Sequence, residues 1–178
     1  MTEEYVPLTI RESGRLKRLG DRAIAQLSAD HFFASPREGD NSVGVIVKHV
    51  SGNLISRWTD FLTSDGEKPG RRRDTEFIIR SEDSQERLLI RWEEGWAALF
   101  KALGPLRSSD LDRTVTIRGE PLTVLQAINR QLTHYAYHVG QIVFLAKHFA
   151  GPAWKSLSIP IGESDQFNQV PTKYVDRA

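Results

Sequence analysis

Two histidines, His134 and His138, lie four residues apart in the segment LTHYAYHVGQIVF, which spans residues 132–144. On a helix, positions four apart differ by only about 40° around the axis, so both imidazoles would lie on one face. That spacing lets two imidazoles converge on one metal ion. A histidine beside an apolar seam is, however, more often a hydrogen-bonded core residue than a metal ligand. The pair alone therefore leaves both interpretations open.

A third histidine, His49, lies near the middle of another predicted helix, beside the apolar seam of that helix. Asn53 and Asp60 follow on the same strip. Packing the two helices side by side would bring His49 toward the histidine pair, which is how metal sites inside helical bundles are built. We therefore predict a metal site formed by His49, His134 and His138, with Asn53 and Asp60 as candidate pocket residues.

The residues around the pair exclude two common kinds of metalloenzyme. No glutamate follows His134, so the segment is not the H-E-x-x-H of zinc proteases. Gln131 and Tyr135 occupy the positions three before each histidine, where a carboxylate-rich di-iron bundle has glutamates. Three neutral imidazoles favour zinc, nickel, iron or copper over magnesium or calcium. Such a site leaves a coordination position open, where a water or thiol can be activated.

The composition is that of an ordinary soluble globular protein: 178 residues, 39% apolar and 26% charged, with a net charge of +1. This balance gives no electrostatic reason to expect nucleic acid or a membrane surface as a partner. The sequence contains no cysteine, which excludes disulfides and cysteine-based zinc modules. It also has no secretory signal and no run of about 20 apolar residues. We expect one cytoplasmic domain over residues 1–178.

Four segments have helical periodicity and recognisable ends. We predict helices from about Pro7 to Leu27, from Asn41 or Ser42 to about Leu62, from Ser81 to Leu103, and from Thr123 to Ala150. Thr123 and Gln126 form the T-x-x-Q of a capping box at the start of the last helix. The predicted apolar side of the first helix consists of Leu8, Leu16, Leu19, Ala23 and Leu27.

The segments between these helices have turn chemistry. Residues 63–80 indicate a long surface connection, and its basic run Lys68 to Arg73 is more typical of a solvated loop than of an anion site. Thr114–Ile117 alternates like a strand, which predicts a small hairpin before the last helix. Residues 151–178 form a predicted irregular tail that packs on the body through Trp154, Leu157, Ile159 and Ile161. Together, these patterns predict an all-α four-helix bundle over about residues 5–150.

Several motifs resemble those of the DinB-like (YfiT-like) superfamily over roughly residues 5–150: the central histidine of the second helix, the Gly-Pro after the third, G-E-P-L-T-V and H-Y-A-Y-H-V-G-Q-I. The closing S-L-S-I-P-I-G-E-S-D-Q-F-N is similar to the tail of an uncharacterised bacterial branch. The resemblance implies an up-down-down-up bundle, often dimeric, with a divalent metal on His49, His134 and His138. Gln141 matches the glutamine of the family's "GQ", where it would support a ligand from behind.

Characterised relatives in that superfamily include thiol-S-transferases that use low-molecular-weight thiols, and a mycothiol-dependent isomerase. The resemblance therefore implies a zinc, nickel or iron enzyme that activates a thiol or water for S-transfer or hydrolysis on a small molecule. Tyr137 is a candidate proton donor near the metal, and no residue is assigned to catalysis. Two alternatives stay open: a non-catalytic bundle that binds a metal or ligand, and a scaffold whose histidines are core residues. Nothing in the sequence supports DNA binding.

Overall fold

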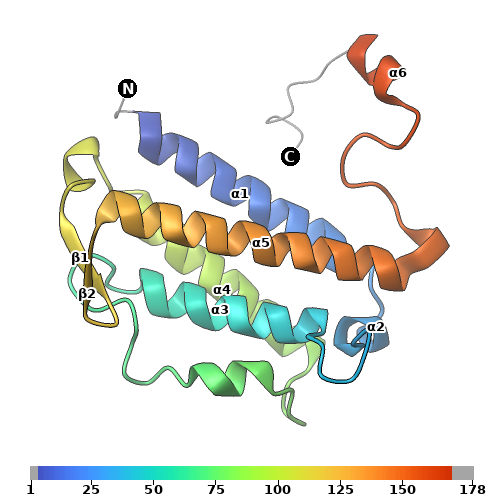
Figure 1. Ribbon diagram of the computed structural model, residues 1–178, viewed down its shortest axis with the longest axis horizontal. Helices are drawn as coiled ribbons and strands as arrows, with labels where there is room; N and C mark the ends of the chain where they lie inside the picture. The colour runs from blue at the N-terminus through green and yellow to red at the C-terminus, as the bar shows by residue number, and fades with distance from the viewer. Residues whose placement is uncertain (1–3, 170–178) are drawn as a thin grey trace.

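The computed structural model describes residues 4–169, and most of this part of the chain is helical (Figure 1). The four long helices are α1 (Tyr5–Ile24), α3 (Val43–Trp58), α4 (Gln85–Leu103) and α5 (Val124–Ala150). The shorter helical elements are α2 (Ala29–Phe33), η2 (Arg73–Phe77), η3 (Ser108–Asp110), η4 (Gly151–Ala153) and α6 (Ser164–Gln169). α3 packs against both α4 and α5, and α1 packs against α5 and α4. The core lies between these four helices.

Side-chain caps fix the starts of α3 and α5, the two helices that carry the histidines. The Ser42 hydroxyl accepts a hydrogen bond from the Val45 amide at 3.2 Å. The Thr123 hydroxyl accepts from the Gln126 amide at 3.1 Å, and the Gln126 side chain accepts from the Thr123 amide at 2.9 Å. This reciprocal pair is the predicted capping box, and it satisfies amides that have no partner within the helix. Both predicted helix starts are confirmed.

Two other predicted helix ends were wrong by about one turn. α3 ends at Trp58 rather than near Leu62, and Asp60 then adopts a left-handed φ of 49°. α4 begins after Ser84 rather than at Ser81, because the Ser84 hydroxyl accepts from the Arg87 amide at 3.2 Å. Two serines three residues apart are equally good caps in the sequence, so only the packing of the helix decides between them.

The buried side of α1 includes Leu16 and Ala23, as predicted, but the prediction was wrong for Leu8. Leu8 is 43% exposed, and the helix instead buries a seam of mostly small residues: Val6, Thr9, Ser13, Leu16, Gly20 and Ala23. Gly20 shows the reason, since a Cβ there would lie 3.1 Å from the Trp92 ring. α1 approaches its neighbours closely through Thr9, Ser13 and Gly20, which hydrophobicity alone did not indicate.

The predicted hairpin is confirmed, with β1 (Thr114–Ile117) pairing antiparallel to β2 (Glu120–Thr123). Ile117 pairs with Glu120, so the loop has two residues, Arg118 and Gly119, whose φ angles are 57° and 75°. Two positive φ values are those of a type I′ turn, which matches the twist of the strands. β2 leads directly into α5 and holds its first turn in place.

The connection after α3 lies on the surface, as the sequence predicted, but it is anchored to the rest of the fold. It lies along α3, and η2 packs against that helix (Figure 1). At one end, the Gly66 amide donates to the Thr116 carbonyl at 2.8 Å, which ties the connection to the hairpin. At the other end, Lys48 donates to the Ile78 carbonyl at 2.8 Å and to Asp83 at 2.6 Å. Because it is anchored at both ends, the connection stays packed against α3.

The segment after α5 partly follows the prediction. Trp154 and Leu157 pack against the core, but Ile161 is fully exposed, so the predicted packing of Ile161 was wrong. The short helix α6 follows within a tail that was predicted to be irregular. Across residues 4–169, no helix combines the length and apolarity needed to cross a membrane.

Candidate metal centre

The three histidines predicted to converge lie together between α3 and α5. His49 comes from the middle of α3, and His134 and His138 come from adjacent turns of α5. One ring nitrogen of each lies within 4.8 Å of the corresponding nitrogens of the other two. The ring centroids are 4.7–5.5 Å apart. This separation is close enough for all three imidazoles to bind one metal ion.

Two of the imidazoles are oriented by a hydrogen bond on the side away from the cluster. His49 Nδ1 lies 2.9 Å from Glu76 Oε2, and because a carboxylate only accepts, Nδ1 donates. His138 Nδ1 donates to Gln141 Oε1 at 2.8 Å. Both contacts leave Nε2 as the nitrogen with a lone pair for a metal. A partner on the far nitrogen is the usual arrangement for metal-binding histidines.

Glu76, which supports His49, was not among the predicted site residues. It lies in η2, and its side chain is 9% exposed. Arg71 donates two parallel hydrogen bonds to its carboxylate, each 2.8 Å long. Gly52 makes room for this group, because a Cβ there would lie 2.8 Å from Glu76 Cδ. Burial alone would raise the pKa of Glu76, but hydrogen bonds from His49 and Arg71 hold it below its ordinary value.

The two histidines of α5 each carry a ring nitrogen that is available to a metal. His134 Nδ1 and His138 Nε2 are buried and make no hydrogen bond within the described residues. Burial, helped by the neighbouring histidines, lowers the pKa of His134 to about 3. Burial likewise lowers the pKa of His138 to about 4, although the hydrogen bond with Gln141 raises that pKa in part. Both imidazoles are therefore neutral at pH 7, and a buried nitrogen lone pair without a partner is what a metal ion would satisfy.

A cavity of about 330 Å³ opens beside His49 and His134. Two further predicted site residues, Asn53 and Tyr137, line it. Asn53 is fixed there, because its carbonyl oxygen accepts from the Tyr135 hydroxyl at 3.0 Å. Asp60 lies elsewhere: it is exposed beyond the end of α3 and lines a different cavity.

The match to a known family extends over nearly the whole chain. A family model described as "Protein of unknown function (DUF1572)" matches residues 1–163. The chain belongs to this family. No curated protein matches the sequence of this DUF1572 member. The geometry of its own residues is therefore the basis for any functional conclusion.

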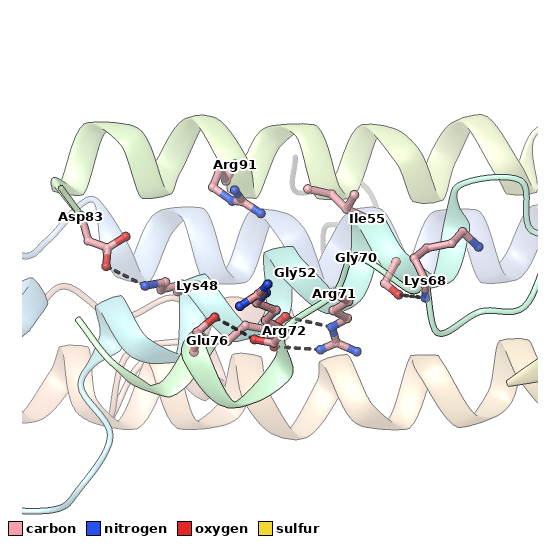
Figure 2. A pocket seen from close by; sticks show the side chains of 12 residues that line it. Lys48, Gly52, Ile55, Lys68, Gly70, Arg71, Arg72, Glu76, Asp83 and Arg91 are labelled. Carbon is pink, nitrogen blue, oxygen red and sulfur yellow. Dashed lines mark hydrogen bonds and ion pairs between the residues drawn. The ribbon is translucent and has the colours of Figure 1, made fainter. Parts of the chain in front are cut away.

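In this DUF1572 member, the basic run from Lys68 to Arg73 is largely the solvated loop that was predicted, and Arg71 is the exception. The Arg71 side chain is only 5% exposed and holds Glu76. Arg71 and Glu76 also line a second cavity of about 460 Å³ on the α4 side of the connection, together with Lys48, Arg72 and Arg91 (Figure 2). One buried ion pair thus separates this cavity from the histidine cluster.

The metal-free protein is expected to lose stability as the pH falls from about 6.5 toward 4. In this interval the unfolded histidines bind protons that native His134 and His138 exclude, so acidification favours the unfolded state. The slope should reach about 1.4 kcal/mol per pH unit for each histidine. Urea unfolding in a chelator across this range measures it. Buried carboxylates titrate in the same direction, so the informative comparison is His138→Gln; a slope equal to that of wild type would contradict the assignment.

Proposed function

We propose that this protein is a metal-dependent enzyme that uses a divalent transition metal on His49, His134 and His138 to act on a small molecule. The observation that carries the proposal is the convergence of three imidazoles beside an open cavity. A structural zinc site normally has four protein ligands, whereas catalytic sites have three and keep one position open. The described residues offer three.

When bound, a divalent ion with three histidine ligands lowers the pKa of a water or thiol in its open position, which gives a nucleophile at neutral pH. Zinc, nickel and iron suit this ligand set. The reaction that we propose is S-transfer from a low-molecular-weight thiol, or hydrolysis. In S-transfer, sulfur forms a bond to an electrophilic carbon, the leaving group departs with its electron pair, and the thiol proton passes to solvent.

Residues around the histidines would orient the metal ligands and the substrate. Glu76 and Gln141 fix the rings of His49 and His138, so that the metal-facing nitrogens stay aimed at one point. Burial raises the pKa of Tyr137, against a lowering effect from Arg73, so its phenol keeps its proton at neutral pH. Tyr137 lines the cavity and is half exposed, which suits a hydrogen-bond donor to a bound substrate.

The proposal extends to the architecture. We infer a DinB-like four-helix bundle with up-down-down-up order, formed by α1, α3, α4 and α5, in a cytoplasmic bacterial homodimer. The pairwise packing of these helices and the H-Y-A-Y-H-V-G-Q-I motif in α5 support this inference. The size of the cavity beside the histidines supports a small molecule as the substrate.

The test is turnover by protein loaded separately with zinc, nickel or iron. Low-molecular-weight thiols are offered with an electrophilic acceptor, and simple esters and amides are offered for hydrolysis. We expect metal-dependent turnover by wild type and its loss in His134→Ala. Metal binding without turnover in any arm would instead favour a non-catalytic, metal-binding module.

A further inference from the structure

Unsatisfied polar atoms concentrate at the cavity beside the histidines. Within residues 4–169, five buried side-chain nitrogen or oxygen atoms have no hydrogen-bond partner. Three of them belong to residues that line this cavity: Arg57 Nε, Gln131 Oε1 and His134 Nδ1. Arg57 and Gln131 are only 6% and 5% exposed. Because buried polar groups are nearly always paired, a cluster of exceptions in one cavity indicates a site for a polar ligand.

The same cavity is lined by arginines from four parts of the chain. Arg57 comes from α3, Arg71 and Arg73 from the connection, Arg118 from the hairpin turn and Arg130 from α5. Among the described residues that line the cavity, none is an aspartate or glutamate. The whole chain has a net charge of only +1, so positive charge is gathered at this place rather than spread evenly.

The carboxylates behind the arginines orient them but do not balance all of their charge. Glu67 is shared by Arg57 at 2.8 Å, Arg71 at 3.3 Å and Arg118 at 3.4 Å. One carboxylate among three guanidinium groups leaves an excess of positive charge, which Glu76 only partly offsets through Arg71. The ion pairs with Glu67 and Glu76 hold the two inner guanidinium groups, on Arg57 and Arg71, beside the cavity.

Two outer arginines, Arg73 and Arg130, form ion pairs only with exposed carboxylates, and Arg73 also lies over the Phe77 ring at 4.9 Å. Arg73 is 48% exposed and lies 3.6 Å from Asp74, which is 98% exposed. Arg130 is 50% exposed and lies 3.3 Å from Glu120, which is 64% exposed. Exposed pairs of this kind contribute little to stability, so both guanidinium groups can turn to a ligand at small cost.

We propose that the substrate of this site is a small molecule carrying an oxyanion group, a carboxylate or phosphate-type group, which the arginines bind while the reacting end lies at the histidine cluster. The inference rests on the proposed function, because it names the substrate class of the same site. Planar guanidinium groups bind both kinds of oxyanion through paired hydrogen bonds. A cavity of about 330 Å³ beside the histidines holds a small ligand with its charged end among the arginines.

Isothermal titration calorimetry at constant ionic strength tests this inference. Succinate, methylphosphonate and the neutral analogue succinamide are titrated into zinc-loaded and into metal-free protein. We expect at least one oxyanion to bind about tenfold or more tightly than succinamide, as the loss of a charge-assisted hydrogen bond implies. The tighter of the two oxyanions identifies the group that the site prefers.

Paired arginine variants provide the matched control. Arg73→Gln/Arg130→Gln removes two half-exposed arginines from the cavity, and Arg80→Gln/Arg113→Gln removes two that are each 50% exposed and ion-paired outside it. Both double variants change the net charge equally. We expect the first to weaken oxyanion binding about tenfold with its zinc content unchanged, and the second to leave both unchanged.

The outcomes separate the two proposals. Equal binding of succinate, methylphosphonate and succinamide, or equal behaviour of the two double variants, would overturn the oxyanion inference even if zinc binds. Failure of wild type to bind any metal would instead overturn the proposed function. The metal-free titration then still tests the arginines by themselves, and arginine-dependent oxyanion binding there would uphold the cavity as an oxyanion site independently of a metal.

Discussion

A His138→Ala variant is expected to bind zinc more than about 100-fold more weakly than wild type, because losing a ligand costs more than losing an outer partner. The change removes one of the three converging nitrogens and leaves His49 and His134 without a third ligand. It also deprives Gln141 of its hydrogen-bond partner. Competition with a chromophoric chelator, using protein purified without a histidine tag, measures the affinity.

His148→Ala is the matched control, since His148 lies in the last turn of the same helix, outside the cluster. It should retain the zinc affinity of wild type. A chelator should lower the melting temperature of wild type and of His148→Ala but not of His138→Ala, because a ligand that binds only the native state stabilises it. If wild type and His138→Ala carry equally little metal, the proposed metal centre is wrong.

Replacing Glu76 by alanine should affect both stability and metal binding. The change leaves the buried Arg71 guanidinium with only its 3.3 Å contact to Glu67 and removes the acceptor of His49 Nδ1. Breaking a buried ion pair on one side costs about 3–5 kcal/mol, so the urea midpoint should fall sharply. Loss of the group that orients His49 should also weaken zinc binding by about 10- to 100-fold.

Glu76→Gln separates the two effects, because it keeps the volume and one carbonyl acceptor but removes the charge. We expect intermediate stability and a smaller loss of zinc affinity. Glu82→Ala is the matched surface control: Glu82 is 52% exposed and lies 3.8 Å from Arg80, so its loss should change stability by no more than about 0.5 kcal/mol. Equal unfolding midpoints for Glu76→Ala and Glu82→Ala would show that the Arg71–Glu76 pair has no structural role.

The sequence contains enough information to bring the histidines together, because each lies on a long helix with regular periodicity. Once the seams of α3 and α5 are defined, His49, His134 and His138 fall on strips that face each other. Arg57 and Arg130 follow from the same geometry: Arg57 lies two turns after His49, and Arg130 one turn before His134. They were missed because an arginine on the edge of a helix is usually solvated.

Glu76 could not be placed in this way, because the connection that carries it has no periodicity. Its position depends on long-range contacts, such as those of Lys48 with Ile78 and Asp83. One signal was nevertheless available. Gly52 lies in the middle of a helix, where glycine is unfavourable by about 1 kcal/mol relative to alanine, so its presence there indicates a close neighbour.

The connection that carries Glu76 has a consequence for how the protein folds. His134 and His138 become neighbours as soon as α5 forms, because their contact is local in sequence. His49 joins them only when α3 docks on α5, and Glu76 only when the connection closes over Gly52. Contacts distant in sequence form late, since the entropy of closing long loops opposes them. A complete and correctly oriented histidine cluster is therefore a property of the finished fold, and partly folded chains offer a metal only the local pair.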